Sequence, residues 1–204
     1  MPIRVADAVA VLVELGVERA HFVGTSWGGR LCFGIGEHAA ERTRSLVIGG
    51  QQPYAWPDSP LTRSVTQGLV RARTEGMEAL VTALEEFWGV RFPETRRARW
   101  LGNDPAALDA AWRAALSEGT ISDDLTSWRV PCLIFIGASD TDFLEQARDA
   151  AAEIPGAEFM SLVGLDHYGA HTDQDDPLLQ AVLRTLRRVD SQSGAGVRVS
   201  GSPP

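Results

Sequence analysis

Short apolar runs alternate with helical segments along this chain, and this alternation constrains the fold more than any other feature. Four runs predict strands, at residues 20–23, 45–48, 130–136 and 158–163. Helical patterns lie at residues 3–15, 27–41, 143–154 and 176–189. Strands that are apolar throughout are buried on both faces, and their alternation with helices indicates a parallel sheet between helical layers. We predict an α/β fold with a mainly parallel sheet of about four strands flanked by helices.

One long stretch, residues 53–128, interrupts this alternation. It is helical in pattern, contains Pro57, Pro60, Pro93 and Pro105, and has no convincing strand. We predict a helical insertion between the second and third strands, which leaves residues 1–52 and 129–190 as the core. The end of the chain, residues 191–204, is rich in Gly, Ser and Pro and is predicted to be disordered.

Composition excludes several classes of function. The net charge of −8 argues against nucleic acid or an anionic membrane as a partner. All 19 basic residues are arginines, which excludes a Schiff-base lysine and a Walker-type phosphate lysine. No apolar run approaches the roughly 18 residues of a membrane span. Cys32 and Cys132 lack zinc-ligand spacing and are expected to be buried thiols of a cytoplasmic protein. No metal or cofactor is expected.

Three residues with the chemistry of a nucleophilic site follow predicted strands. Ser26 follows the first strand, Asp140 the third and His167 the fourth. Ligands of parallel sheets bind at the carboxyl ends of the strands, so these side chains are expected to meet. A Ser–Asp–His order in the chain is also the order of one known type of catalytic triad.

The stretch GTSWGG, residues 24–29, predicts a strained turn that carries the nucleophile. Gly24 and Gly28 supply small neighbours on both sides of Ser26, and Gly29 allows close packing of helix on strand. Ser26 then lies at a helix N-terminus, where the backbone N–H of Trp27 is the predicted oxyanion donor.

Each of the three residues has an expected role in moving the proton of the nucleophile. His167 takes the proton from Ser26, and Asp140 holds the imidazole in the required tautomer. Taken singly, Asp140 or Asp142 could be a helix N-cap, and His167 a solvated loop residue with His171 as its rival. The order of the three residues and their places at strand ends favour a triad.

Three segments together resemble the α/β-hydrolase superfamily over about residues 3–189. VAVLVELGVERAHFVGTSWGGRLCFGIGEHAAERTRSLVIGG resembles its nucleophile segment, PCLIFIGASDTD its acid segment and GLDH its histidine loop. The resemblance implies a serine hydrolase that acts on a small, largely apolar ester or related acyl substrate. Carbon–carbon bond hydrolases and cofactor-free haloperoxidases share this triad, whereas epoxide hydrolases and haloalkane dehalogenases use an aspartate where Ser26 stands.

The resemblance also exposes a departure, because members of the family begin with several strands before this point. One of their early loops supplies a second oxyanion donor, and losing one such donor costs about 10²–10³ in rate. Without a neighbour, strand 20–23 is an exposed apolar edge. Two explanations stay open. We favour a fragment or a late start, with low activity; the other is a short form that dimerises through the edge.

The insertion corresponds to the place where the family has its cap. It holds five of the six tryptophans: Trp56, Trp88, Trp100, Trp112 and Trp128. Most are expected to pack the cap, while Trp56 and Trp88, with Trp27, are expected to line an apolar substrate pocket over Ser26. The arginines of RFPETRRARW indicate a solvated helix face in preference to an anion site.

Two rival functions remain. One is a non-catalytic, hydrolase-like binding module, which the missing oxyanion donor favours and the complete triad disfavours. The other is a nucleotide-binding protein that uses GTSWGG as a phosphate loop. It fits poorly, because no acidic residue ends the next strand in SLVIGGQQ.

Overall fold

The computed structural model describes residues 1–172 and 176–192, with the side chains of residues 171, 172 and 176 left out. The chain divides into two compact units. We call Met1–Pro53 with Ser122–Pro204 the core unit and Tyr54–Ile121 the insert unit. Residues 122–128, which the sequence placed in the insertion, therefore belong to the core unit.

The core unit is built on a parallel sheet of four strands in the order β1-β2-β3-β4, which confirms the predicted fold class. The strands are β1 (Ala20–Thr25), β2 (Thr43–Gly49), β3 (Cys132–Gly137) and β4 (Glu158–Leu162). The helices are α1 (Pro2–Glu14), α2 (Trp27–His38), α7 (Leu144–Glu153), α8 (His167–Thr172) and α9 (Asp176–Gln192). Two short 3₁₀ helices, η1 (Ala40–Arg42) and η2 (Leu125–Ser127), also belong to this unit.

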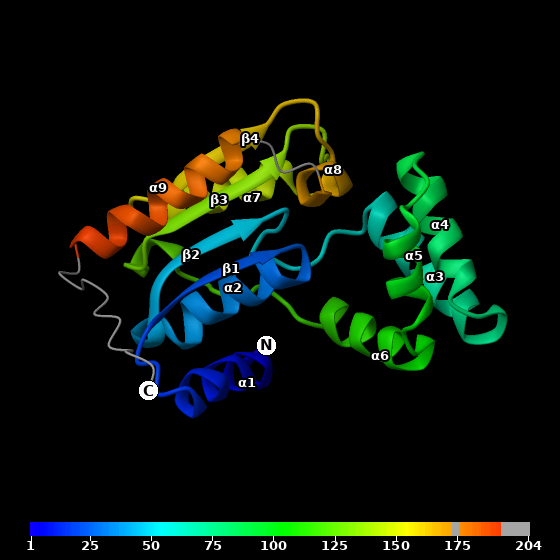
Figure 1. Cartoon of the computed structure of the whole chain (residues 1–204), viewed down its shortest axis with the longest axis horizontal. Helices are drawn as coiled ribbons and strands as arrows, with labels where there is room; N and C mark the ends of the chain where they lie inside the picture. Colours follow the sequence, from blue (N-terminus) through cyan, green and yellow to red (C-terminus); the bar gives the residue numbers. More distant parts are fainter. Residues whose placement is uncertain (173–175, 193–204) are drawn as a thin grey trace, which may run out of the picture. The chain divides into compact units, whose positions relative to one another are not determined.

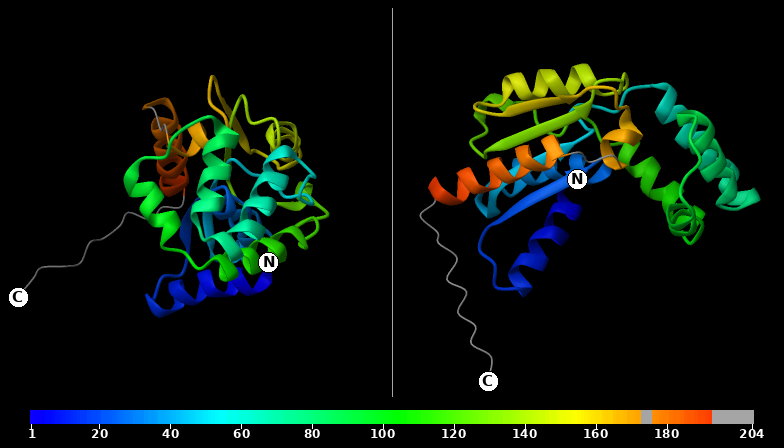
Figure 2. Two further views of the ribbon diagram at one scale, coloured as in Figure 1. Left: turned by 90° about the vertical axis from the view of Figure 1, so that its right-hand side faces the viewer. Right: turned by 45° about the horizontal axis from the view of Figure 1, so that its top comes forward.

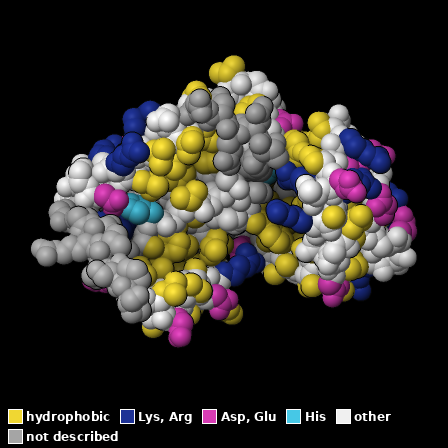
Figure 3. Space-filling view, in the orientation of Figure 1, with side chains coloured by type: hydrophobic (Ala, Val, Ile, Leu, Met, Phe, Trp, Pro, Cys, Tyr) yellow, Lys and Arg dark blue, Asp and Glu magenta, His cyan; other side chains and the backbone are white. Residues whose placement is uncertain are grey.

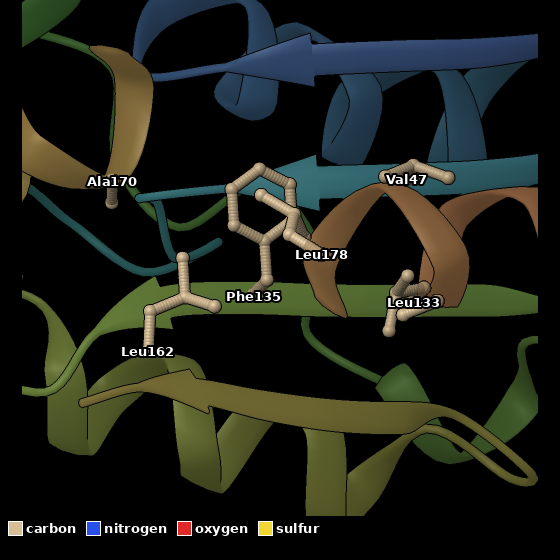
Figure 4. Close-up of a cluster of buried hydrophobic side chains, with 7 residues drawn as sticks. Val47, Leu133, Phe135, Leu162, Ala170 and Leu178 are labelled. Carbon is tan, nitrogen blue, oxygen red and sulfur yellow. The ribbon is translucent and has the colours of Figure 1, made fainter. Parts of the chain in front are cut away.

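Helices cover both faces of this sheet: α9 lies on one face, and α2 and α7 lie on the other (Figures 1 and 2). The alternation of side chains along β2 explains the two layers. Val47 belongs to the cluster under α9, whereas Leu46 points toward Gly36 of α2. Figure 4 shows the first cluster, whose buried members are Val47, Leu133, Phe135, Leu162, Ala170, Leu178 and Ala181.

Two helices end more than one residue from the predicted position, and one helix was not predicted. Helix α2 ends at His38, not at residue 41, because Ala39 has φ −147° and ψ 37° and leaves the helical region. Helix α9 continues to Gln192, two residues into the predicted tail; the rest of that tail lies outside the described residues. The loop expected around His167 is the helix α8, whose six residues are too few to show a periodic pattern.

The insert unit consists of four helices: α3 (Pro60–Glu75), α4 (Glu78–Trp88), α5 (Glu94–Leu101) and α6 (Pro105–Leu116). Proline at the first turn starts α3 and α6, and Ser59 and Asp104 cap them through their side-chain oxygens. Two helix ends are thus defined by residues that the sequence displays directly.

A buried carboxylate organises the arginine-rich segment of the insert unit. Glu85 is 8% exposed and accepts from Arg97 Nη1 at 2.6 Å and from the Phe92 backbone N–H at 2.8 Å. Arg91 lies 3.6 Å from the same carboxylate, and Arg97 also pairs with Glu78. The hydrogen bond from Arg97 holds the pKa of Glu85 below its ordinary value, against the opposing effect of burial. The predicted solvated face is therefore wrong for Arg97, which is a structural cation.

Apolar side chains are exposed on β1 and α1, at one edge of the sheet (Figure 3). Val23 of β1 is 58% exposed, and Ile3 and Val13 of α1 are 79% and 63% exposed. Within the part of the chain that the structure describes, no helix is both long and apolar enough to cross a membrane.

Candidate active site

Ser26 occupies a strained turn between β1 and α2. Its φ of 54° and ψ of −117° make it the one non-glycine residue with positive φ among the described residues. Its backbone N–H donates to Gly49 O at 2.8 Å, which ties the turn to the end of β2. Such strain persists where the surrounding structure imposes it, and it commonly marks a functional residue. The turn holds the Ser26 side chain at the carboxyl end of the sheet.

The glycines around Ser26 differ in how strictly the turn requires them. A Cβ at Gly24 would lie 2.2 Å from Gly28 O, and one at Gly29 would lie 2.7 Å from Gly49 O. Neither approach is sterically allowed, so both positions need glycine. A Cβ at Gly28 would meet nothing within 4 Å. The sequence expectation that Gly28 must be small for steric reasons is therefore wrong, since its Cα–H bond points into open space.

The structure brings Ser26, His167 and Asp140 together in one hydrogen-bonded series. Ser26 Oγ lies 3.1 Å from His167 Nε2, and His167 Nδ1 lies 2.7 Å from Asp140 Oδ2. The Nδ1–H donates a hydrogen bond to the carboxylate, which leaves the Nε2 lone pair to accept from the Ser26 hydroxyl. Asp140 is 3% and His167 7% exposed, so both lie in a region of low dielectric.

Two loops hold the acid and the histidine against each other. The Ser139 N–H donates to Leu165 O at 2.9 Å, which joins the loop after β3 to the loop after β4. A Cβ at Gly137 would lie 2.4 Å from Leu165 O, so only glycine allows this approach. The ring of Phe143, which is buried, packs on the His167 imidazole with centroids 5.5 Å apart.

The simpler interpretations of these residues can now be compared with their contacts. Helix α7 has Phe143 at its N-cap position, so neither Asp140 nor Asp142 is the N-cap residue of that helix. His21 lies in β1, and its two ring nitrogens contact Ser45 Oγ at 2.6 Å and Asp190 Oδ1 at 3.0 Å. The side chain of His171, the rival of His167, lies outside the described residues.

A model of the alpha/beta hydrolase family matches residues 2–181, which is most of the chain. The chain belongs to the alpha/beta hydrolase family. Among curated proteins it is similar to 3-oxoadipate enol-lactonase 1 of Acinetobacter baylyi, with 27% identity over 146 residues. The match covers 66% of this chain and 52% of the relative, so this alpha/beta hydrolase chain spans about half the length of that protein.

Solved structures show the same alpha/beta hydrolase fold. A carboxylesterase structure from Nitrososphaera gargenis aligns with a TM-score of 0.78 and 18% identity, over 94% of this chain and 73% of that one. The enol-lactonase from Burkholderia xenovorans LB400 aligns with a TM-score of 0.72 and 22% identity, over 90% and 71%. MenH from S. aureus aligns with a TM-score of 0.75 and 18% identity, over 91% and 74%. At these identities the likeness establishes the fold alone.

The tryptophans assigned to the substrate lie in different parts of this alpha/beta hydrolase. Trp27 is the first residue of α2, and its side chain is 37% exposed. Trp56 lines a cavity of about 390 Å³ within the insert unit and packs edge-on against Trp112, with centroids 5.2 Å apart. Trp88 contacts the rings of Phe87 and Phe92. That Trp27, Trp56 and Trp88 contact a substrate stays a prediction.

Sequence reasoning missed Gln51, which follows β2 next to the strained turn. This side chain is fully buried, and its Oε1 accepts from the Gln52 backbone N–H at 3.0 Å. Its Nε2 has no hydrogen-bond partner among the described residues. An unsatisfied buried donor costs about 1–3 kcal/mol. In the sequence, QQ after an apolar strand looks like an ordinary loop, so only the contacts distinguish Gln51.

Proposed function

We propose that this chain is a serine hydrolase with Ser26 as nucleophile, His167 as general base and acid, and Asp140 as the orienting carboxylate. One observation carries the proposal: the unbroken Ser26–His167–Asp140 hydrogen-bonded series on a strained turn. Family membership supports it, because hydrolysis is the chemistry for which the family is named.

The first half of the proposed reaction forms an acyl-enzyme. Ser26 Oγ attacks the carbonyl carbon while its proton moves to His167 Nε2, and the carbonyl oxygen becomes an oxyanion. The backbone N–H of Trp27, at the N-terminus of α2, is the proposed donor to that oxyanion. When the tetrahedral intermediate collapses, the alkoxide leaves and takes the proton from His167.

The second half repeats these steps with water. His167 Nε2 removes a proton from the water molecule, and the resulting oxygen attacks the acyl carbon attached to Ser26. Collapse of the second tetrahedral intermediate releases the acid and returns the proton to Ser26 Oγ. Asp140 stays ionised throughout and stabilises the imidazolium that forms in both halves.

The proposed substrate is a small, largely apolar ester or a related acyl compound. The names of two similar proteins, an enol-lactonase and a carboxylesterase, both denote cleavage of an ester bond. The half-exposed Trp27 next to Ser26 supports an apolar surface for the acyl group. The rival interpretation, a binding module without turnover, explains neither the strain at Ser26 nor its contact with His167.

Labelling with a serine-directed fluorophosphonate tests the proposal directly. We expect the reagent to modify Ser26, and we expect Ser26→Ala to abolish both labelling and hydrolysis of p-nitrophenyl esters. Ser45→Ala is the matched control, because Ser45 also contacts an imidazole but is fully buried in β2. Labelling that persists in Ser26→Ala would place the nucleophile elsewhere, and a protein that binds esters without labelling would support the binding module.

The cytoplasm is the proposed location, and free, buried thiols at Cys32 and Cys132 support a reducing environment. Burial raises the pKa of both thiols to about 12, which keeps them unreactive.

We also propose that two copies associate through the edge of β1, where Val23 is exposed. Light scattering tests this: Val23→Lys should lower the mass of any dimer to that of a monomer.

A further inference from the structure

The segment that follows β2 runs directly beside the proposed nucleophile. The Ser26 N–H donates to Gly49 O, and Gly50, with a φ of 58°, turns the chain at that point. Gln51 then packs against the first turn of α2, since a Cβ added at Gly29 would lie 3.1 Å from Gln51 Cβ. Gln51 therefore adjoins the turn that holds Ser26, at the edge of the sheet where ligands bind.

The amide of Gln51 has a defined orientation and an unused donor. Because Oε1 accepts from the Gln52 N–H at 3.0 Å, the amide cannot be reversed without losing that bond. Its NH₂ group is buried and has no acceptor among the residues that the structure describes. Buried polar groups at the other end of β2 differ in this respect: Ser45 Oγ contacts His21, and Thr43 Oγ1 donates to Ala39 O.

A side chain needed only to fill this space would be apolar, because a buried donor without an acceptor is costly to fold. Such a cost is retained where the group serves a ligand. A buried NH₂ donor can also discriminate between substrates, since a site that hydrogen-bonds a substrate oxygen rejects the analogue in which that oxygen is missing.

We propose that the Gln51 side-chain amide binds an acceptor oxygen of the acyl group, separate from the scissile carbonyl. The inference rests on the proposed function, because it assigns a specificity residue to the same reaction. It makes the preferred substrate an acyl group that is mostly hydrocarbon but carries one ketone, ether or hydroxyl oxygen. With a purely hydrocarbon acyl group the Gln51 donor stays unpaired in the complex.

The experiment compares esters that differ by one oxygen. The p-nitrophenyl esters of 4-oxopentanoate and 5-oxohexanoate are each paired with the ester of the same length that has a methylene in place of the ketone. We expect the native chain to prefer at least one oxo ester in kcat/KM. Gln51→Leu should lower that preference by about fivefold to tenfold, the worth of one neutral hydrogen bond, and change the methylene ester less than about twofold.

Two further variants separate binding from folding. Gln51→Glu keeps an oxygen for the Gln52 N–H but replaces the NH₂ donor, so it should also lose the preference. Gln52→Leu alters an equally buried glutamine in the same segment and should keep the preference. An unchanged preference in both Gln51 variants, or an equal loss in Gln52→Leu, overturns the inference.

Fluorophosphonate labelling distinguishes failure of this inference from failure of the proposed function. Where turnover is slow, the methyl esters of the same acids compete with the fluorophosphonate for Ser26. The concentration of each ester that halves the labelling rate is measured, and the ratio between the oxo ester and its methylene analogue replaces the ratio of kcat/KM values. Labelling of Ser26 without any oxo preference overturns the role of Gln51 alone. Absence of labelling overturns both.

Discussion

The core unit contains two series in which an imidazole bridges a serine hydroxyl and a carboxylate. In the first, His167 contacts Ser26 through Nε2 and Asp140 through Nδ1. In the second, His21 contacts Ser45 through Nδ1 and Asp190 through Nε2, and Arg44 pairs with Asp190 at 3.0 Å. The residue types are the same, but the orientation of the ring is reversed.

The backbone separates the two series. Ser26 lies on a strained turn after a strand, whereas Ser45 lies inside β2 with none of its surface exposed. No helix begins at Ser45 to stabilise an oxyanion. The second series links α9 to β1 and β2 instead. The comparison teaches that the place of the serine on the backbone, more than the trio of side chains, makes a site suitable for catalysis.

Replacing each of the two histidines with alanine, one at a time, gives the largest expected difference in activity between the two series. His167→Ala should lower kcat by about 10⁴–10⁶, because the residues of a triad act as a unit. His21→Ala should leave kcat within about threefold and lower the thermal midpoint, since it removes the link between β1 and α9. Steady-state assays and thermal unfolding measure both effects. His171→Ala is a second control, and a loss there like that of His167→Ala would contradict the assignment.

The two aspartates sharpen the same contrast. Asp140→Asn should lower kcat by about 10⁴, because an amide no longer selects the tautomer that leaves Nε2 free to accept. Asp190→Asn makes the same chemical change in the second series and should leave kcat unchanged. Circular dichroism confirms that both variants are folded before kinetics are compared. Equal losses of activity would mean that both series serve one site.

The glycines test whether the strained turn, rather than the side chains, defines the first series. Gly24→Ala forces a Cβ against Gly28 O and should cost about 1–3 kcal/mol of stability, with loss of Ser26 labelling. Gly28→Ala meets open space on a helix and should raise stability by up to about 1 kcal/mol. Denaturant unfolding gives both values. A tolerated Gly24→Ala would show that the turn can relax.

The smallest expected effect is a pH dependence of stability that arises from the second series. The hydrogen bond from His21, with the charge of Arg44, holds the pKa of Asp190 below its ordinary value despite some burial. A carboxyl whose pKa is lower in the folded state stabilises the protein above its ordinary pKa of about 3.9 and loses that effect as pH falls through the depressed value. The difference in thermal midpoint between the native chain and Asp190→Asn should therefore shrink steadily below about pH 4. A constant difference would mean that the pairing contributes nothing.

Much of the core could be predicted because its signals are local. Each of the four strands contains a short apolar run, and Ser26, Asp140 and, five residues after β4, His167 follow three of them. Topology alone places such residues at one edge of a parallel sheet. The short helix α8 escaped prediction because six residues are too few to show a periodic pattern. Its first turn is stabilised by a contact that the pattern does not display, in which the Gly169 N–H donates to Asp166 Oδ1.

The sequence by itself determined the order of strands and helices and the residue types available at the strand ends, because burial patterns and turn residues depend on near neighbours in the chain. Only the tertiary structure decided which imidazole meets Ser26, that Ser45, His21 and Asp190 form a second series, and that Gln51 retains an unused donor. The hydrogen bonds of the two series join residues that lie 24 to 169 positions apart in the chain. The hydrogen bonds between them are set by the register of β1 on β2 and the packing of α8 and α9, which no local pattern of residues encodes.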